Sequence, residues 1–225
     1  MSCIGARKHP RPHSSGDVNK TILIASFNRG KVREIREALS SALIECFSLD
    51  AIPQIPPCVE SGSTFEENAR LKAIYYSQAW PWLTLADDSG LVVDALDGAP
   101  GVHSARFISD FASDEERCQE LLCRLNGVPA SRRSARFICI MALALKGDIK
   151  AVVEGRVEGE IASAPAGRNG FGYDPIFLFP KLEKTMAELT STEKLAISHR
   201  GQALSKLKKL LVAWDCLDNS RQAPA

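Results

Sequence analysis

The feature that most constrains the fold is the alternation of short apolar runs with segments of helical spacing. After Lys20, the run TILIASF is apolar and partly β-branched, which predicts a buried strand. The polar tripeptide NRG interrupts it, and KVREIREALSSAL then carries apolar residues (Val32, Ile35, Leu39, Ala42) at helical spacing. A strand, a tight loop and a helix in this order indicate an α/β architecture.

Helices and strands continue to alternate along the chain. A helix is expected at about residues 65–80, because Thr64 and Glu67 have capping-box spacing, and SDEERCQELLCRLNG shows the same pattern. ARFICIMALAL and KAVVEGRVEGEIAS predict neighbouring strands joined by a turn at residues 147–148. DPIFLFP predicts one more strand, and SHRGQALSKLKKLLVAW a final helix capped by Ser198. We therefore expect one α/β unit with a mixed sheet, bilobed around a cleft.

Length and composition fit a single folded domain. With 225 residues, 45% of them hydrophobic and 24% charged, the chain can bury a substantial core. Residues 21–214 are expected to form the domain, with a C-terminal tail at residues 215–225. Residues 1–20, rich in Arg, Lys, Pro and Ser, predict a disordered N-terminal extension, and a transit peptide is the weaker interpretation.

Charge and cysteine content exclude several function classes. Lys and Arg number 28 and Asp and Glu 27, so no overall field attracts nucleic acid or an anionic membrane. The seven cysteines include no C-x-x-C pair and no histidine lies at zinc spacing, which indicates small buried side chains in a reducing cytosol. Because no apolar run reaches membrane-spanning length, we expect a cytoplasmic protein with neither a membrane nor a nucleic acid partner.

The stretch LTLADDSGLVVDAL places two acids, Asp87 and Asp88, inside apolar sequence. A buried carboxylate is costly unless it is paired, hydrogen-bonded or bound to a metal. One interpretation is a surface turn, because Asp-Ser-Gly is favourable turn sequence between two strands. The other is a functional pair of acids. The stretch predicts a strand, a turn and a second strand.

SFNRGK, which joins the first strand to the first helix, invites comparison with a phosphate-binding loop. It is not the Walker sequence, because the upstream glycine is missing and Val32 follows the lysine where Ser or Thr would bind magnesium. Backbone N–H groups at a helix start nevertheless attract anions. Arg29 and Lys31 lie where the helix dipole disfavours cations, which favours a bound polyanion; two solvated, tolerated cations are the alternative.

Two further segments break the local patterns. Lys72 interrupts an apolar helical stripe, so its ammonium either extends past the core to solvent or points into a cleft. In PAGRNGFGYDP, the glycines allow close approach to a ligand, and Phe171 and Tyr173 beside Asp174 would flank a nucleobase. A hairpin loop with a small aromatic cluster is the alternative for this second segment.

EKLAISHRG gathers Lys194, His199 and Arg200 at a second basic helix entrance. Arg donates to phosphate or carbonyl oxygens, and His donates or accepts near neutral pH. Acids can hold a divalent cation, basic helix entrances can hold phosphates, and an aromatic loop can hold a base. Together these are the parts of a nucleoside triphosphate site.

Five blocks resemble, in order, the signature blocks of the inosine/xanthosine triphosphate pyrophosphatase family: SFNRGKVREI, ESGSTFEENARLKA, LADDSGLVVDALDGAPGVHSARF, GFGYDPIF and AELTSTEKLAISHRGQAL. The resemblance spans residues 21–211. It implies Mg²⁺-dependent hydrolysis of ITP, dITP and XTP between the α and β phosphates, which releases the monophosphate and pyrophosphate. It also implies an elongated mixed sheet with flanking helices, two lobes around a central nucleotide-binding cleft, and a homodimer.

The resemblance also implies site residues. Glu60 and Asp88 match the metal-associated acids, and Asp88 also matches the base that activates water; Asp87 and Lys72 complete the expected catalytic group. The expected substrate-binding residues are Ser26, Phe27, Asn28, Arg29, Gly30, Lys31, Ser89, Phe171, Gly172, Tyr173, Asp174, Lys194, His199 and Arg200. We expect Asp87 and Asp88 at a strand end facing the cleft, where Mg²⁺ offsets the cost of their adjacency. Phe27 departs from the family pattern, which commonly has glycine there.

Three rival functions have different sequence requirements. A septum-formation-type pyrophosphatase, which acts on modified pyrimidine nucleotides, fits the FGYDP and SHRGQAL blocks less well. A nucleotide sensor that binds without cutting would be easier to accept if Asp88 were Asn or Lys31 were apolar. A haloacid-dehalogenase-like phosphatase needs an Asp-x-Asp-x-Thr motif after its first strand, which SFNRGK does not provide.

Overall fold

The computed structural model describes residues 21–40, 42 and 44–221, and the predicted extension at residues 1–20 lies outside them. The strands are β1 (Thr21–Ile24), β2 (Glu45–Ser48), β3 (Leu83–Val93), β4 (Ser134–Leu145), β5 (Asp148–Ile161), β6 (Phe177–Phe179) and β7 (Lys184–Thr185). The α-helices are α1 (Arg29–Ser40), α2 (Phe65–Ser77), α3 (Asp114–Arg124), α4 (Ser191–Ile197) and α5 (His199–Arg221). Short 3₁₀ helices are η2 (Leu49–Ala51), η3 (Asp94–Leu96), η4 (Gly101–Arg106), η5 (Ala130–Arg132), η6 (Asp174–Ile176) and η7 (Met186–Glu188).

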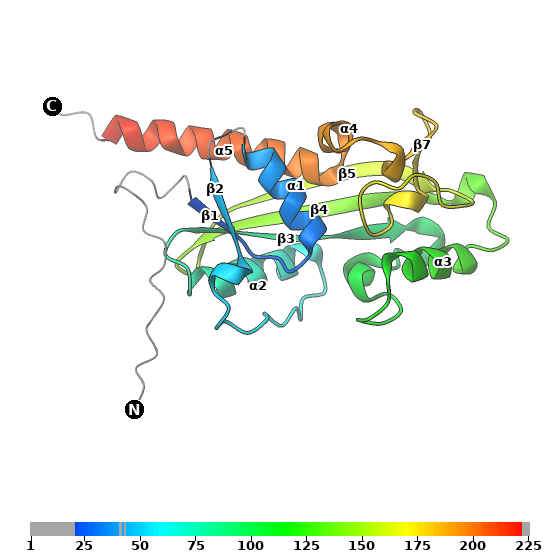
Figure 1. Cartoon of the computed structure of the whole chain (residues 1–225), viewed down its shortest axis with the longest axis horizontal. Helices are drawn as coiled ribbons and strands as arrows, with labels where there is room; N and C mark the ends of the chain where they lie inside the picture. The colour runs from blue at the N-terminus through cyan, green and yellow to red at the C-terminus, as the bar shows by residue number, and fades with distance from the viewer. Residues whose placement is uncertain (1–20, 41, 43, 222–225) are drawn as a thin grey trace.

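The strands form one mixed sheet in the order β2-β1-β3-β4-β5-β6-β7. β1 pairs in parallel with β2 and β3, whereas β3 to β7 pair antiparallel with their neighbours in sequence. β4 and β5 form a long hairpin, joined at Lys146 and Gly147, which both have positive φ. Figure 1 shows that the long strands give the molecule an elongated shape. The elongated mixed sheet with flanking helices that the sequence predicts is thus confirmed.

β3 runs without interruption through Asp87 and Asp88, so the predicted turn at these acids is wrong. Antiparallel pairing with β4 covers residues 84–93 and satisfies the backbone groups on that side of the strand. On its other side β3 pairs with β1 only as far as Leu85, whose carbonyl also accepts from the Ala25 N–H. Beside the two acids, the edge of β3 is therefore not covered by β1.

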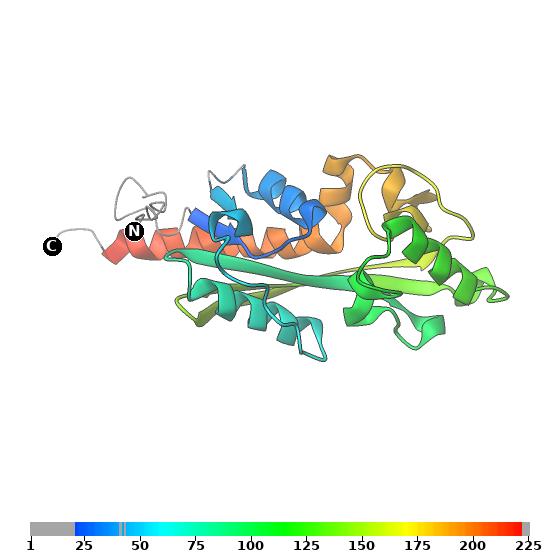
Figure 2. The same cartoon turned by 60° about the horizontal axis from the view of Figure 1, so that its bottom comes forward.

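Helices cover both faces of the sheet. In both views α1 and α5 lie against one face and α2 lies against the other (Figure 1; Figure 2). One apolar core, which includes Ile35 and Leu207, lies under α1 and α5, and a second, which includes Ala73, lies under α2. A third core at the far end of the sheet joins Leu121 of α3 to Phe177 of β6. Since alternate residues of a strand face opposite sides, residues in the first half of β3 face α1 and α5 or α2 in turn, whereas its last residues pack in the third core.

The predicted helix starts are confirmed by their capping contacts. Thr64 accepts from the Glu67 N–H while the Glu67 carboxylate accepts from the Thr64 N–H, and Ser113 opens α3 in the same way. Ser198 Oγ accepts from the Gly201 N–H at the start of α5. α5 continues past residue 214, where the sequence predicts a tail to begin, and residues 222–225 lie outside the described part. None of the described helices combines the length and apolar character that a membrane span requires.

Candidate active site

A cleft opens beside the uncovered edge of β3, near the carboxyl end of β1. Ligands in α/β sheets commonly bind outside the carboxyl ends of strands. The residues that line the cleft are Asn28, Lys31, Ser89, Gly90, Ser104, Ala105, Asp114, Arg117, Phe137, Phe171, Gly172, Tyr173, Asp174, Lys194, His199 and Arg200. Most of the predicted substrate-binding residues are therefore brought together, although they come from widely separated parts of the chain.

Asp87 is buried and points to the face covered by α1 and α5. Its carboxylate accepts from the Ser89 hydroxyl at 2.8 Å and the Cys139 thiol at 3.2 Å. The same carboxylate pairs with Lys31 Nζ at 2.7 Å and Arg200 Nε at 2.9 Å. Burial would raise the pKa of Asp87, but Arg200 and Lys31 hold that pKa well below its usual range. With both oxygens engaged, Asp87 holds the two cations in place and is not available as a base.

Asp88 points to the opposite face, toward α2. Lys72 Nζ donates to Asp88 Oδ1 at 2.7 Å and to the Asp87 carbonyl at 3.0 Å, and lies 3.4 Å from Glu60 Oε1. Burial would lower the pKa of Lys72, but Asp88 and Glu60 raise it, so the ammonium stays charged. Burial raises the pKa of Asp88, and Lys72 opposes that rise. Lys72 is thus a buried partner of the acids and does not extend to solvent.

The expectation that Asp87 and Asp88 both face the cleft from a strand end is wrong. Adjacent residues of a strand project to opposite faces, so the two acids meet different cations. Lys31 and Arg200 offset the cost of burial on one face, and Lys72 does so on the other. The acids also lie within β3 and not at its end; the strand end that they approach is that of β1.

The Glu60 and Asp88 carboxylates fit the predicted Mg²⁺. Asp88 Oδ2 is buried and has no hydrogen-bond partner, which is costly unless a ligand satisfies the atom. The Glu60 side chain remains 31% exposed, and carboxylate oxygens are the protein ligands that Mg²⁺ prefers. Within the described residues no group of three or more His, Cys, Asp or Glu could hold a metal ion. Water and substrate oxygens would therefore have to complete the coordination shell.

The loop before α1 is organised by its own side chains. Asn28 Oδ1 accepts from the Lys31 N–H at 3.0 Å, as a helix cap does, and Ser26 Oγ accepts from the Asn28 N–H at 3.2 Å. Phe27 is 64% exposed, and Arg29 is exposed as well. The structure thus brings Asn28 and Lys31 to the cleft wall, but not Ser26, Phe27 or Arg29.

Phe171 packs directly against Gly30. A Cβ atom on Gly30 would lie 2.4 Å from Cδ1 of the Phe171 ring, so the close approach depends on glycine. Lys194 Nζ lies 4.7 Å and Arg200 Cζ 5.5 Å from the centre of the Phe171 ring, within the range of cation–π contacts. Lys194 also pairs with Asp174 of the same loop. The aromatic loop, residues 171–174, therefore contacts both the loop before α1 and the basic residues at the start of α5.

His199 lines the cleft as a neutral ring. It is buried and stacks on Phe137, with ring centroids 4.7 Å apart and an interplanar angle of 11°. Burial, with the nearby charge of Arg200, lowers the pKa of His199 well below its usual range. Its Nδ1 is buried without a hydrogen-bond partner. A neutral imidazole can donate one hydrogen bond and accept another.

The sequence pattern of the Ham1 family matches residues 22–210 of this chain. The chain belongs to the Ham1 family. The match runs from β1 into α5 and includes every candidate site residue described above. The family resemblance indicated by the five sequence blocks is thus confirmed.

Named relatives and solved structures support Ham1 membership. A "dITP/XTP pyrophosphatase" from Geobacillus kaustophilus is 50% identical over 188 residues, which are 84% of this chain and 92% of the relative. A protein of the same name from Bacillus subtilis is 46% identical over 196 residues, 87% of this chain and 99% of the relative. The structure of a HAM1 protein from Coxiella burnetii is 44% identical, with a TM-score of 0.78, and covers 86% of this chain and 98% of its own.

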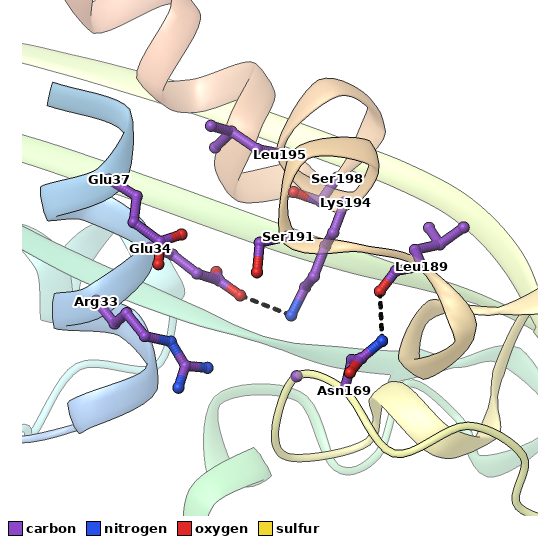
Figure 3. Close-up of a pocket in the computed structure, with 10 residues that line it drawn as sticks. Arg33, Glu34, Glu37, Asn169, Leu189, Ser191, Lys194, Leu195 and Ser198 are labelled. Carbon is purple, nitrogen blue, oxygen red and sulfur yellow. Dashed lines mark hydrogen bonds and ion pairs between the residues drawn. The ribbon is translucent and has the colours of Figure 1, made fainter. Parts of the chain in front are cut away.

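Glu34 is a residue of this Ham1 site that sequence reasoning missed. Its carboxylate lies 2.7 Å from Lys194 Nζ and 2.6 Å from Arg200 Nη1. Figure 3 shows Glu34 reaching from α1 toward Lys194 of α4, beside a cavity between the two helices. Burial would raise the pKa of Glu34, but Arg200 and Lys194 lower it. The available signal was its position three residues after Lys31, on the same side of the helix.

Proposed function

We propose that this Ham1 chain hydrolyses the non-standard purine nucleoside triphosphates ITP, dITP and XTP to the monophosphate and pyrophosphate, with Mg²⁺ as cofactor. The reaction removes deaminated purines from the nucleotide pool. The name dITP/XTP pyrophosphatase, carried by relatives that are 46% and 50% identical over most of this chain, supports the substrate class. The chemistry of the Glu60 and Asp88 carboxylates supports the metal.

The observation that carries the proposal is that a cationic cleft and a carboxylate with a free oxygen lie on the two sides of β3, beside its open edge. On one face of β3, Lys31, Lys194 and Arg200 lie in a cleft with Phe171. On the other face, Asp88 keeps one carboxylate oxygen without a partner. A nucleotide with its base near Phe171 can extend its phosphates past the edge of β3 to Asp88. The free oxygen of Asp88 supports hydrolysis, because it can accept a proton from an attacking water.

The site residues supply binding, orientation and proton transfer. Lys31 and the backbone N–H groups at the start of α1 bind and orient the phosphates. Glu60 and Asp88 would hold Mg²⁺, which neutralises phosphate charge and polarises phosphoryl oxygens when bound. A water oxygen bonds to the α-phosphorus, its proton passes to Asp88, and the bond to the bridging oxygen breaks to release pyrophosphate. Lys72 favours the ionised form of Asp88 that accepts this proton.

Selection among purines is assigned to hydrogen-bond donors beside Phe171. ITP and XTP present a 6-oxo acceptor where ATP presents an amino donor. The neutral ring of His199 and the guanidinium of Arg200 both line this part of the cleft. A donor-rich site rejects the amino form of ATP, because buried donors would be left unpaired. GTP carries the same 6-oxo group, so its rejection requires a different contact, such as crowding near its 2-amino group.

The test of the proposal measures pyrophosphate and orthophosphate as separate products. The purified protein and its Asp88→Asn variant are incubated with Mg²⁺ and each of ITP, XTP, ATP, GTP and CTP. We expect pyrophosphate from ITP and XTP, little from the others, and a loss of about 100-fold or more in the variant. Asp148→Asn, which removes a carboxylate that is 79% exposed, is the matched control and should keep full activity.

Several outcomes would contradict the proposal. Orthophosphate as the direct product, or full activity in Asp88→Asn, would rule out the mechanism. Tight binding of ITP without turnover would favour a nucleotide sensor. Preferential turnover of CTP would favour the septum-formation type of pyrophosphatase.

Two expectations about the whole protein stay predictions. The homodimer is tested by light scattering coupled to gel filtration, where a monomer would contradict it. The cytoplasmic location is tested by cell fractionation with an antibody against the native chain.

A further inference from the structure

The aromatic loop of the cleft is held from the side of α3 as well as from α4. The Gly172 N–H donates to Asp114 Oδ2 at 2.6 Å, and the Cys118 thiol donates to the Gly172 carbonyl at 3.4 Å. The next residue, Tyr173, is buried, and its hydroxyl donates to the Ser104 carbonyl at 2.9 Å. These contacts fasten the loop to the first two turns of α3 and to η4.

Arg117 fixes the carboxylate of Asp114. Its Nη2 lies 2.6 Å from Asp114 Oδ1, and its Nη1 donates to the carbonyls of Ala105 and Ala112. The Arg117 side chain is only 13% exposed. Because Arg117 holds one carboxylate oxygen and Gly172 the other, Asp114 forms a bridge between α3 and the loop.

Asp114 differs from the other acids in the first turn of α3. Acids are generally favoured at a helix N-terminus, so the presence of Asp114, Glu115 and Glu116 there is not itself informative. The Glu116 carboxylate closes the capping box with Ser113, and the Glu115 carboxylate accepts from Gln119 within the helix. Of the three, Asp114 is the acid whose carboxylate contacts the aromatic loop and lines the cleft.

The backbone conformation of Gly172 is consistent with a need for the Asp114 hydrogen bond. Gly172 has φ +63°, a conformation that L side chains rarely adopt. A Cβ atom placed on it would meet nothing within 4 Å, so glycine is needed for the backbone conformation and not for space. The hydrogen bond to Asp114 therefore holds a segment whose backbone conformation is itself unusual.

We propose that Asp114 is a positioning residue for the base of the substrate. By holding the Gly172 N–H, it helps to fix where Phe171 and Tyr173 stand in the cleft, whereas its own carboxylate contacts Gly172 and Arg117 and not the phosphate-binding groups. This inference rests on the proposed function, because it takes the aromatic loop as the base side of the nucleotide site. Loss of one charge-assisted hydrogen bond corresponds to about tenfold in affinity. Since the effect is on binding, kcat should stay within roughly twofold.

The experiment compares Asp114→Ala, Asp114→Asn and Glu115→Ala with the wild type. KM and kcat are measured for ITP, and the inhibition constant is measured for tripolyphosphate, which carries no base. We expect Asp114→Ala to raise KM about tenfold and to leave kcat and the inhibition constant unchanged. Asp114→Asn, which keeps an acceptor oxygen, should recover part of the affinity. Glu115→Ala should match the wild type.

The outcomes separate this inference from the function on which it rests. With an active wild type, equal KM values for Asp114→Ala and Glu115→Ala would overturn the positioning role. An equal loss of affinity for ITP and for tripolyphosphate would also overturn it, since a general structural defect acts on both. If Asp114→Ala does not fold, Asp114→Ser replaces it, because the shorter side chain loses the contact with the Gly172 N–H, and an unchanged KM in that variant overturns the role. A wild type that turns over neither ITP nor XTP would contradict the proposed function and this inference together.

Discussion

Lys72 and Asp88 form a buried ion pair, with Lys72 Nζ 2.7 Å from Asp88 Oδ1, while Asp88 Oδ2 has no partner. The pair joins α2 to β3 on the face opposite Asp87. One oxygen of the acid is thus held by a cation, and the other is left for a ligand at the open edge of the sheet. The chemistry of the site therefore depends on how firmly Lys72 keeps Asp88 ionised.

Lys72→Gln should move the acidic limb of the kcat/KM profile for ITP to higher pH. Burial already raises the pKa of Asp88 and Lys72 opposes the rise, so removal of the ammonium raises that pKa further. Each unit of increase lowers the ionised fraction about tenfold at a pH below the pKa. Steady-state rates over the acidic and neutral range measure the shift. Arg70→Gln, which breaks an exposed pair on the same helix, is the control, and an unmoved acidic limb would contradict the role of Lys72.

Asp87→Asn should lower the free energy of unfolding by about 3 kcal/mol at neutral pH, because Lys31 and Arg200 lose a buried counter-charge. The folded-state pKa of Asp87 is depressed, so its stabilising contribution is present above the unfolded pKa and is lost as the pH falls through the folded pKa. The difference in the free energy of unfolding between the wild type and the variant should therefore begin to decrease below about pH 4. Urea unfolding at several pH values measures both free energies. A difference that stays constant into strong acid would speak against this account.

Glu34→Gln should raise KM for ITP about tenfold, since Lys194 and Arg200 lose the carboxylate that they share. Glu37→Gln is the matched control, because Glu37 is exposed and lines the same cavity one helical turn further along α1 (Figure 3). Steady-state kinetics with ITP measure both variants. A similar rise in KM for both variants would show that the loss of a negative charge near the cavity is responsible, and not the loss of the Glu34 contacts with Lys194 and Arg200.

Gly30→Ala should displace the Phe171 ring and lower kcat/KM for ITP, because the added methyl carbon would lie 2.4 Å from a ring atom. A double-mutant cycle with Phe171→Ala tests this cause. The Gly30→Ala substitution should cost much less in the Phe171→Ala background, where no ring is left to displace. If the two losses simply add, the contact between Gly30 and Phe171 does not explain the effect.

Helix starts were predictable from sequence because capping depends on residues three positions apart. Thr64 with Glu67 and Ser113 with Glu116 open helices as expected. The interior of β3 was mispredicted for the opposite reason. Asp-Ser-Gly favours a turn locally, but pairing with β4 keeps the strand continuous, and cations pair with both of its acids. Tertiary contacts outweighed the local preference.

The candidate site was predictable to the extent that its residues stand in the family blocks. Asn28, Lys31 and the residues of the aromatic loop reach the cleft as expected, whereas Phe27 and Arg29 are exposed away from its wall. The residue types predicted that the loop before α1 is basic. The direction of each of its side chains, however, depends on how α1 packs against the sheet.

The sequence by itself determined the family, the α/β class and the chemical groups of the site, because periodicity, capping and motif order are all properties of short segments. Only the tertiary structure decided that Asp87 and Asp88 serve opposite faces of β3, since that follows from the continuity of the strand. It also decided the contacts of Glu34 and Asp114, which join segments far apart in the chain. No local pattern specifies such partners, because they arise when helices and loops pack on a common sheet.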